Sequence, residues 1–546
     1  VLRSADLKEF ARWLGPDGAG FVNAPAGAVA LNGALRVRPK QIGISDALGD
    51  IAGERFEGSF AYDATAARPR LTADLETAAF DLSRLAGDLL DPGVLAAKLG
   101  FTDVGAIPDT AGKATRLFED MDLSLQLRAQ ELTDGKRTFK DVQADIDRIG
   151  DRLTIRRLDI DWQPGMKLAL SGGLEGLGKA AAGKLQATLS AAGDTAATRL
   201  AHLLSRLLGQ NVPAAGLISR APFRLAIDAT LGGGSGPSAD PDYPTVIVAD
   251  GATSTGRLRL TARTAGPLTG WRDQSAHLDA HLSGQRPLDV ARWLIGKPIK
   301  ASSTRDNAPK NAAGGLSKRA PANVLLSLVG KPMQSMRAVA RFAAGEMLAV
   351  DFSGSVALTP GTVLATNWSG DLMLKRADAV ILSELLWPPL VGRIAAAPVS
   401  GRVTLAGGSG DLAIEPKRIQ FAGSSLTGSL KLSEANALTG TLAVSKAPIS
   451  VLSTLILDHR PGREVNAADD PDAPLPWPPQ QFDVSHLAGL SADLALTIDR
   501  LNNDTGAMLA RDIKTRLELA GDRVMLNGLE ARMREWHLKG QAELVR

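Results

Sequence analysis

The chain has 546 residues, of which 44% are hydrophobic, and its Lys and Arg residues outnumber its Asp and Glu residues by only three, 62 against 59. The charges are interspersed along the chain, which argues against a nucleic-acid-binding surface, so no nucleic-acid partner is expected. There is no cysteine, which excludes disulfides, thiol catalysis and Cys-based zinc sites.

No stretch of the sequence approaches the roughly 20 apolar residues that a membrane-spanning helix needs, and no signal peptide is recognised. The first residue is Val1 and not Met. We therefore expect the chain to be a piece of a larger protein, with any membrane anchor or export signal outside it.

Short strands dominate the pattern. Most are five to eight residues long and end at Gly, Asp, Asn or Pro, as is typical of an antiparallel meander. In chain order, examples are Phe56–Tyr62, Arg70–Glu76, Lys184–Ser190, Phe223–Ala229, Arg257–Ala262, Met347–Ala357, Gly370–Lys375, Gly401–Leu405, Leu426–Leu432 and Gly440–Val444.

Short amphipathic helices interrupt these strands. Apolar residues spaced i, i+3, i+4 and i+7 follow an Asp that can cap the first turn. The predicted helices begin near Asp6, Asp81, Asp194, Asp289, Asp378 and Pro448. Helices this short are marginally stable alone and are expected to pack on the sheet.

The chain divides into six predicted segments. Residues 1–180, which hold the first copy of a repeated meander, and 323–458 are two β-groove segments. Residues 181–296 are a middle segment of strands and helices, and 482–546 hold the second meander copy. Two loops separate them: a basic, flexible one at 297–322 and an insertion rich in Pro and Asp at 459–481.

One β-meander occurs twice, about 370 residues apart. The first copy covers residues 122–173 and the second begins at Asp493. Leu123, Leu125 and Leu127 alternate with polar residues, which predicts a strand with one apolar face. The matched positions are Asp122/Asp493, Asp141/Asp512, Gly150/Gly521, Asp151/Asp522, Arg152/Arg523 and Leu158/Leu529. Gly-Asp-Arg in each copy predicts the turn between the next two strands.

Two motifs in the sequence could form a phosphate-binding or a metal-binding site. Gly173–Lys179 has the spacing of a phosphate-binding loop, but Ala180 stands where Ser or Thr would hold magnesium, so a turn is the better interpretation. His277, Asp279 and His281 would share one face of a strand and could bind a metal. The polar face of an amphipathic strand, with Leu278 and Leu282 on the opposite side, is the better explanation, so no metal, cofactor or catalytic residue is expected.

The apolar faces of the strands could be covered in two ways. They could pack on each other or on the short helices, or they could line an open trough. A soluble protein rarely leaves more than a few hundred Å² of contiguous apolar surface uncovered, so a trough would need a ligand such as acyl chains.

The chain resembles the AsmA family of bacterial envelope proteins. The resemblance lies in the repeated meander, in the helices beginning at Asp6-Leu7 and Asp81-Leu82, and in the stretches Phe60–Ala64 and Arg68–Leu71. It implies a large periplasmic β-groove, an amino-terminal inner-membrane helix and a role in outer-membrane biogenesis, similar to TamB-like and bridge-like lipid transfer proteins. The membrane helix is missing from this sequence.

We therefore expect a mainly β fold: an elongated, curved antiparallel sheet with short amphipathic helices along its edges. The expected function is non-enzymatic transfer of phospholipids between the inner and outer membranes, in the periplasm of a Gram-negative bacterium. Alternatives are a scaffold for outer-membrane proteins that uses exposed strand edges, and an envelope hydrolase with His277 and His281 in its site.

The expected groove-lining residues are the apolar members of the two meanders: Leu123, Leu125, Leu127, Val142, Ile146, Leu153, Ile155, Leu494, Leu496, Ile498, Ile513, Leu517, Val524 and Leu526. Strand alternation alone does not say what their face meets. Burial against the helices or a facing sheet remains the alternative for each.

Overall fold

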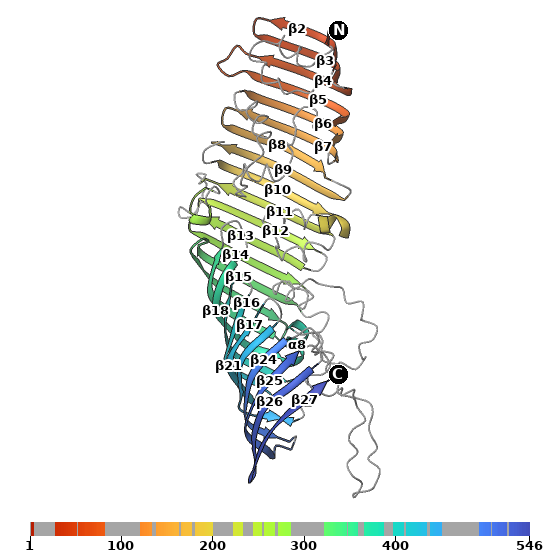
Figure 1. Ribbon diagram of the computed structural model, residues 1–546. Helices are drawn as coiled ribbons and strands as arrows, with labels where there is room; N and C mark the ends of the chain where they lie inside the picture. Colours follow the sequence, from red (N-terminus) through yellow and green to blue (C-terminus); the bar gives the residue numbers. More distant parts are fainter. Residues whose placement is uncertain are drawn as a thin grey trace. The chain divides into compact units, whose positions relative to one another are not determined.

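The computed structural model describes residues 2–4, 28–51, 53–81, 121–133, 138–162, 165–176, 181–199, 222–232, 244–253, 256–267, 271–284, 321–346, 348–358, 365–386, 397–408, 411–433, 437–449, 491–503, 505–520 and 523–545. Within these ranges the protein is mainly β, and its 27 strands belong to one open, predominantly antiparallel sheet. The predicted fold class is confirmed (Figure 1).

The chain forms two compact units. Unit 1 contains residues 1–282, 328–334 and 360–364, and unit 2 contains 283–327, 335–359 and 365–546. The strands of unit 1 are β1 (Leu2–Ser4), β2 (Val29–Arg38), β3 (Gln41–Ile51), β4 (Glu54–Asp63), β5 (Arg70–Asp81), β6 (Asp122–Thr133), β7 (Thr138–Ile149), β8 (Arg152–Asp161), β9 (Met166–Glu175), β10 (Ala182–Ala191), β11 (Phe223–Leu231), β12 (Thr245–Thr253) and β13 (Gly256–Thr264).

The division between the units cuts through β14 (Ala276–Gly284) and β15 (Ala322–Lys331), and the short helix η2 (Trp271–Asp273) precedes β14. The strands of unit 2 are β16 (Ser335–Ala344), β17 (Leu348–Leu358), β18 (Ala365–Asp378), β19 (Pro398–Gly407), β20 (Leu412–Phe421), β21 (Ser424–Leu432), β22 (Ala437–Val444), β23 (Ala447–Pro448), β24 (Ser491–Asn502), β25 (Met508–Ala520), β26 (Arg523–Met533) and β27 (Trp536–Val545).

The strands of each unit pair mostly in chain order. From β1 to β13 each strand is hydrogen-bonded to the next, and every pair is antiparallel except β5 and β6, which are parallel. In unit 2 the parallel partners are β22 and β23 with β24. Long connections precede β6 and β24, which permits the parallel pairing.

Both meander copies therefore begin with a strand added in parallel and continue as antiparallel hairpins. Their second hairpins have the same register, because Ile146 faces Ile155 in β7–β8 and the matching Leu517 faces Leu526 in β25–β26. Their first hairpins differ by two residues, since Leu125 faces Ile146 whereas Leu496 faces Thr515. A slip of two residues keeps every side chain on its original face.

The strands predicted from sequence lie within observed strands, apart from the first residue of Met347–Ala357, which lies outside the described residues. Of the predicted helices, residues 194–199 are helical as expected after Asp194. Helix α8 (Ala379–Leu386) follows Asp378, whose carboxylate accepts a hydrogen bond of 2.8 Å from the backbone N–H of Val380, the expected cap. The helices predicted after Asp6, Asp81 and Asp289, and all but the first residue after Pro448, lie outside the described residues.

Candidate ligand-binding face

Side chains that face each other across the strands of unit 1 form a continuous apolar ladder. Directly paired residues occupy the same face of a sheet, so the pairing register decides which faces are continuous. The central ladder runs through every strand from β2 to β13 and consists of Leu35, Ile44, Phe60, Ala73, Leu125, Ile146, Ile155, Gly172, Leu185, Ala229, Ile247 and Ala262.

A second ladder on the same face lies two residues away along most strands, and three residues away at the bulges in β3 and β8. From β3 to β13 it consists of Ala47, Gly58, Leu75, Leu127, Ala144, Leu158, Leu170, Ala187, Ile227, Ala249 and Leu260. On the other side of the central ladder, a third one from β5 to β11 consists of Leu71, Leu123, Arg148, Leu153, Leu174, Gly183 and Leu231. We call the surface made by these three ladders the apolar face of unit 1.

Unit 2 is built in the same way. One ladder crosses every strand from β16 to β22 and from β24 to β27, and consists of Ala338, Gly354, Gly370, Leu405, Ile414, Leu430, Gly440, Leu494, Leu517, Leu526 and Ala542. A second ladder on the same face consists of Phe342, Val350, Leu374, Gly401, Ile419, Leu426, Val444, Ile498 and Ile513, the last two of which are predicted groove residues. We call the surface made by these two ladders the apolar face of unit 2.

The structure thus places eleven of the fourteen predicted groove residues in these ladders. The other three, Val142, Leu496 and Val524, lie two residues from a ladder member in their own strands. Five of the fourteen are buried: Val142, Ile155, Leu494, Ile498 and Ile513. The other nine are half-buried: Leu123, Leu125, Leu127, Ile146, Leu153, Leu496, Leu517, Val524 and Leu526. Most of the predicted residues therefore retain some area that is open to a ligand.

The central ladder is long compared with ordinary surface patches. From β2 to β13 it takes eleven steps of about 4.8 Å, roughly 50 Å in all. Three ladders about 7 Å apart cover a strip of the sheet of roughly 700 Å². Part of this strip is buried, for example at Ile44, Ile155 and Leu174. The length of this strip could not be read from sequence, because it depends on the register of every strand pair.

The opposite face is polar and held by ion pairs. The acidic pairs Asp145/Asp147 and Asp159/Asp161 lie there, at positions that alternate with the apolar ladders. The guanidinium of Arg156 donates to Asp145 at 2.6 Å and also bonds to Asp147. These contacts, with the hydrogen bond to Asp145 first, raise the pKa of Arg156 above its ordinary value. Lys167 pairs with Asp161 at 3.0 Å. These carboxylates thus act as partners of surface cations.

One cation interrupts the apolar face of unit 1. Arg148 lies in the third ladder between Leu123 and Leu153, close to the turn at Gly150. It is the one ionisable residue among the three ladders, and the position matching it in the second meander is Leu519. An arginine can lay its apolar stem along such a surface. Alternation from Ile146, two residues earlier in the same strand, was a signal that could have placed it on this face.

Aromatic rings cover glycines of the apolar face in unit 2. The ring of Phe352 lies over Gly354 and Gly370, and that of Trp368 lies over Gly407, so close that a Cβ there would overlap it. The two rings meet edge to face at 6.2 Å. They fill the space that the missing side chains leave, which keeps the apolar surface continuous.

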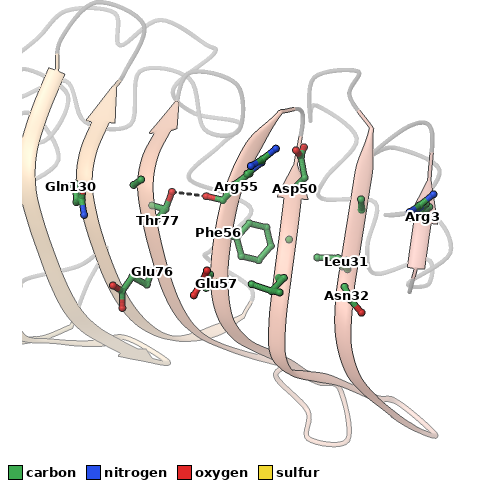
Figure 2. A pocket seen from close by; sticks show the side chains of 14 residues that line it. Arg3, Leu31, Asn32, Asp50, Arg55, Phe56, Glu57, Glu76, Thr77 and Gln130 are labelled. Carbon is green, nitrogen blue, oxygen red and sulfur yellow. Dashed lines mark hydrogen bonds between the residues drawn. The ribbon is translucent and has the colours of Figure 1, made fainter.

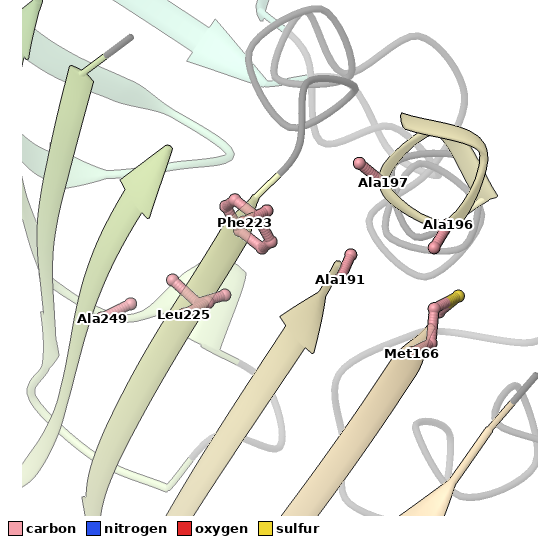
Figure 3. Close-up of a cluster of buried hydrophobic side chains, with 7 residues drawn as sticks. All are labelled: Met166, Ala191, Ala196, Ala197, Phe223, Leu225 and Ala249. Carbon is pink, nitrogen blue, oxygen red and sulfur yellow. The ribbon is translucent and has the colours of Figure 1, made fainter. Parts of the chain in front are cut away.

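Helical residues cover one end of the strands in unit 1. Ala196 and Ala197, in the helix of residues 194–199, form a buried cluster with Met166, Ala191 and Phe223 at the ends of β9, β10 and β11 (Figure 3). This cluster shows how the short helices pack on the sheet. It lies at the strand ends, whereas Leu170 and Leu185 nearer the middle remain half-buried.

A hollow of about 640 Å³ lies at the β1–β5 end of unit 1 (Figure 2). Its charged members are Arg3, Asp50, Arg55, Glu57 and Glu76. Asp50 is paired with Arg55 and Glu57 with Glu76 across the strands, at positions that alternate with the apolar ladders. Apolar residues, among them Leu31, Leu48 and Phe56, also line it, so the lining of this hollow is mixed.

The phosphate-loop-like motif begins in a β-strand, and the His277 motif lies in one. Gly173 lies inside β9, which pairs with the antiparallel strand β10. Residues 177–180, at the end of this motif, lie outside the described residues. His277 and Asp279 lie on β14 within 3.1 Å of each other, and Asp279 also contacts Arg263 at 3.4 Å. Among the described residues no group of three potential ligands is placed to hold a metal ion.

In the described part of the chain, no helix combines the length and the apolar character that crossing a bilayer requires. No protein-family model matches the sequence, and no curated protein or solved structure matches it significantly.

Proposed function

We propose that this protein is a non-enzymatic lipid-binding and lipid-transfer protein, in which the apolar faces of units 1 and 2 hold the acyl chains of phospholipids. The observation that carries the proposal is the central ladder of unit 1, which crosses β2 to β13 with only apolar residues and one glycine.

Two properties of these faces favour acyl chains over other ligands. Polar ligands need a few well-placed polar groups for orientation, and the central ladder offers none. A hydrocarbon tail needs only contiguous apolar contact, which contributes about 25 cal/mol for each Å² removed from water. The half-buried state of residues such as Leu125, Ile146 and Leu185 leaves area for such contact.

The resemblance to the AsmA family supports the setting of this activity. We propose that the protein works in the periplasm of a Gram-negative bacterium, anchored to the inner membrane by a segment outside this chain. Its substrates would be phospholipids passing between the inner and outer membranes, and envelope proteins would be its partners.

The proposal is tested by purifying the chain from a bacterial envelope and analysing it by native mass spectrometry and lipid extraction. Several phospholipid molecules per chain are expected, with no strong dependence on head group. A chain that is free of lipid after purification without detergent, and that takes up none from vesicles, would refute the proposal.

A second candidate function is a scaffold for outer-membrane proteins that binds their strands. It is favoured by β27, which is paired with β26 and has no second partner among the described residues; residues 536–543 of this strand are exposed. An exposed strand edge can accept an added strand. Capture of an unfolded outer-membrane protein by the lipid-free chain would support this function.

A further inference from the structure

Three arginines lie directly opposite one another in unit 2. Arg500 in β24 faces Arg511 in β25, Arg511 faces Arg532 in β26, and the row ends at His537 in β27. All four side chains are exposed. Like charges in directly opposed positions destabilise a sheet, so this row favours an anionic partner.

Only part of this charge is balanced nearby. Asp512 contacts Arg532 at 3.5 Å, and Glu530 in the neighbouring row pairs with Lys539 at 2.8 Å. No ion pair of Arg500 or Arg511 is found within the described ranges. The row therefore keeps a net positive charge at the end of the sheet.

Exposed apolar side chains lie at the same edge. Trp536 is 78% exposed and Met533, directly opposite it, is 42% exposed; the two flank the turn between β26 and β27. Met508, at the start of β25, is 55% exposed. Two of these residues are next to members of the arginine row in sequence: Met533 follows Arg532, and Trp536 precedes His537.

We propose that this edge of unit 2, formed by Arg500, Arg511, Arg532, Met508, Met533 and Trp536, docks on the surface of an anionic lipid membrane. Tryptophan prefers the boundary between head groups and hydrocarbon, where its ring is buried and its N–H stays hydrated. Basic residues are attracted to the negative potential of an anionic leaflet. Arg532 and His537 point to one side of the sheet and Met533 and Trp536 to the other. The strand ends at this turn therefore present both features, which a purely polar polyanion would not require.

The first experiment measures binding of the whole chain to vesicles. Vesicles containing phosphatidylglycerol should sediment the protein, and vesicles of phosphatidylcholine alone should do so much less. Replacing two arginines (Arg500→Gln with Arg511→Gln) should weaken binding to the anionic vesicles roughly 30-fold, and added salt should weaken binding of the unchanged chain.

The matched control is a second pair of opposed arginines in the same unit. Arg402 faces Arg418 in β19–β20, so Arg402→Gln with Arg418→Gln removes the same charge from another site. This variant should bind like the unchanged chain. Equal losses in both double variants would show a general charge effect and overturn the proposal.

The second experiment reports on the edge itself. Because the chain has no cysteine, Trp536→Cys can be labelled with a polarity-sensitive dye. Anionic vesicles should shift its emission to shorter wavelength, whereas a dye on Ser429→Cys, an exposed site in β21, should not respond. No shift at position 536, or a shift with duplex DNA and none with vesicles, would overturn the proposal.

Docking is also separable from acyl-chain binding by the apolar faces. A variant with Leu125→Asp and Leu496→Asp should still sediment with anionic vesicles. If it loses both bound lipid and sedimentation while remaining folded, the membrane contact belongs to the apolar faces and the docking proposal fails.

Discussion

Asp141 and Asp512, which occupy matching positions in the two meander copies, have the same unusual backbone conformation, with φ angles of 46° and 53°. Each lies at an irregularity in the pairing with the following strand, between Lys140 and Gln143 in β7 and between Arg511 and Lys514 in β25. The left-handed conformation is tolerated by Asp better than by most residues, and by Gly best. The sequence repeat thus encodes a repeated β-bulge.

This conformation predicts the effect of substitution at Asp141. Asp141→Gly should leave stability unchanged or raise it, whereas Asp141→Val should lower the free energy of unfolding by about 1–2 kcal/mol, because a β-branched residue is strained at positive φ. Urea denaturation followed by circular dichroism measures both. The control is Gln143→Val, at an exposed strand position of ordinary φ, which should be harmless.

Substitutions at two neighbouring glycines in β9 are predicted to have different effects on stability. Gly172 has a φ angle of 136°, and a Cβ there would lie 2.1 Å from the carbonyl oxygen of Lys184; at Gly173 the nearest atom would be 3.6 Å away. Gly172→Ala should therefore destabilise unit 1 by about 1–3 kcal/mol, and Gly173→Ala should not. Equal unfolding midpoints for the two variants would contradict this explanation.

A charge on the apolar face should abolish lipid binding. Leu125 lies between Ala73 and Ile146 in the central ladder of unit 1, and Leu496 faces Leu442 in unit 2. Asp at either position would have to be desolvated by an acyl chain at a cost of several kcal/mol, so the variants should lose bound phospholipid.

The control for these variants is Gln126→Asp, on the polar face one residue from Leu125. It should retain lipid. Circular dichroism should show that all variants remain folded; unfolding of the Leu125 and Leu496 variants would identify these residues as ordinary core and contradict the lipid-binding proposal.

The ion pair between Asp493 and Arg516 predicts a pH dependence. The guanidinium of Arg516 donates to the carboxylate of Asp493 at 2.7 Å, and this hydrogen bond lowers the pKa of Asp493 below its ordinary value. A lowered pKa means that the pair stabilises the fold at neutral pH and that this contribution is lost as the pH falls through the pKa of the folded state. NMR titration should find the pKa of Asp493 below 3.8, and Arg516→Gln should raise it. An unchanged value would show that the pair does not persist in solution.

Much of the fold could be predicted from local pattern. The alternation of Leu123, Leu125 and Leu127 identified a strand with one apolar face, and the Asp378 cap identified α8. Both signals are contained within one element, where side-chain periodicity follows directly from backbone geometry.

The continuity of the apolar face could not be predicted in this way. Which residue faces Leu125 depends on the pairing of β5 with β6, two strands about 40 residues apart in sequence that turn out to be parallel. Alternation from Ile146 does place Arg148 on the apolar face, whereas the residue type of Arg148 favours the polar face. Long-range register is a property of the assembled sheet.

The central ladder also has a consequence for movement. An alkyl chain lying across β2 to β13 meets a comparable wall at each interstrand step, so advancing by one strand breaks and re-forms nearly equivalent contacts. The free-energy profile along that direction is then shallow and repetitive. Under the proposed lipid-transfer function, thermal motion is sufficient to move an acyl chain across the strands of unit 1.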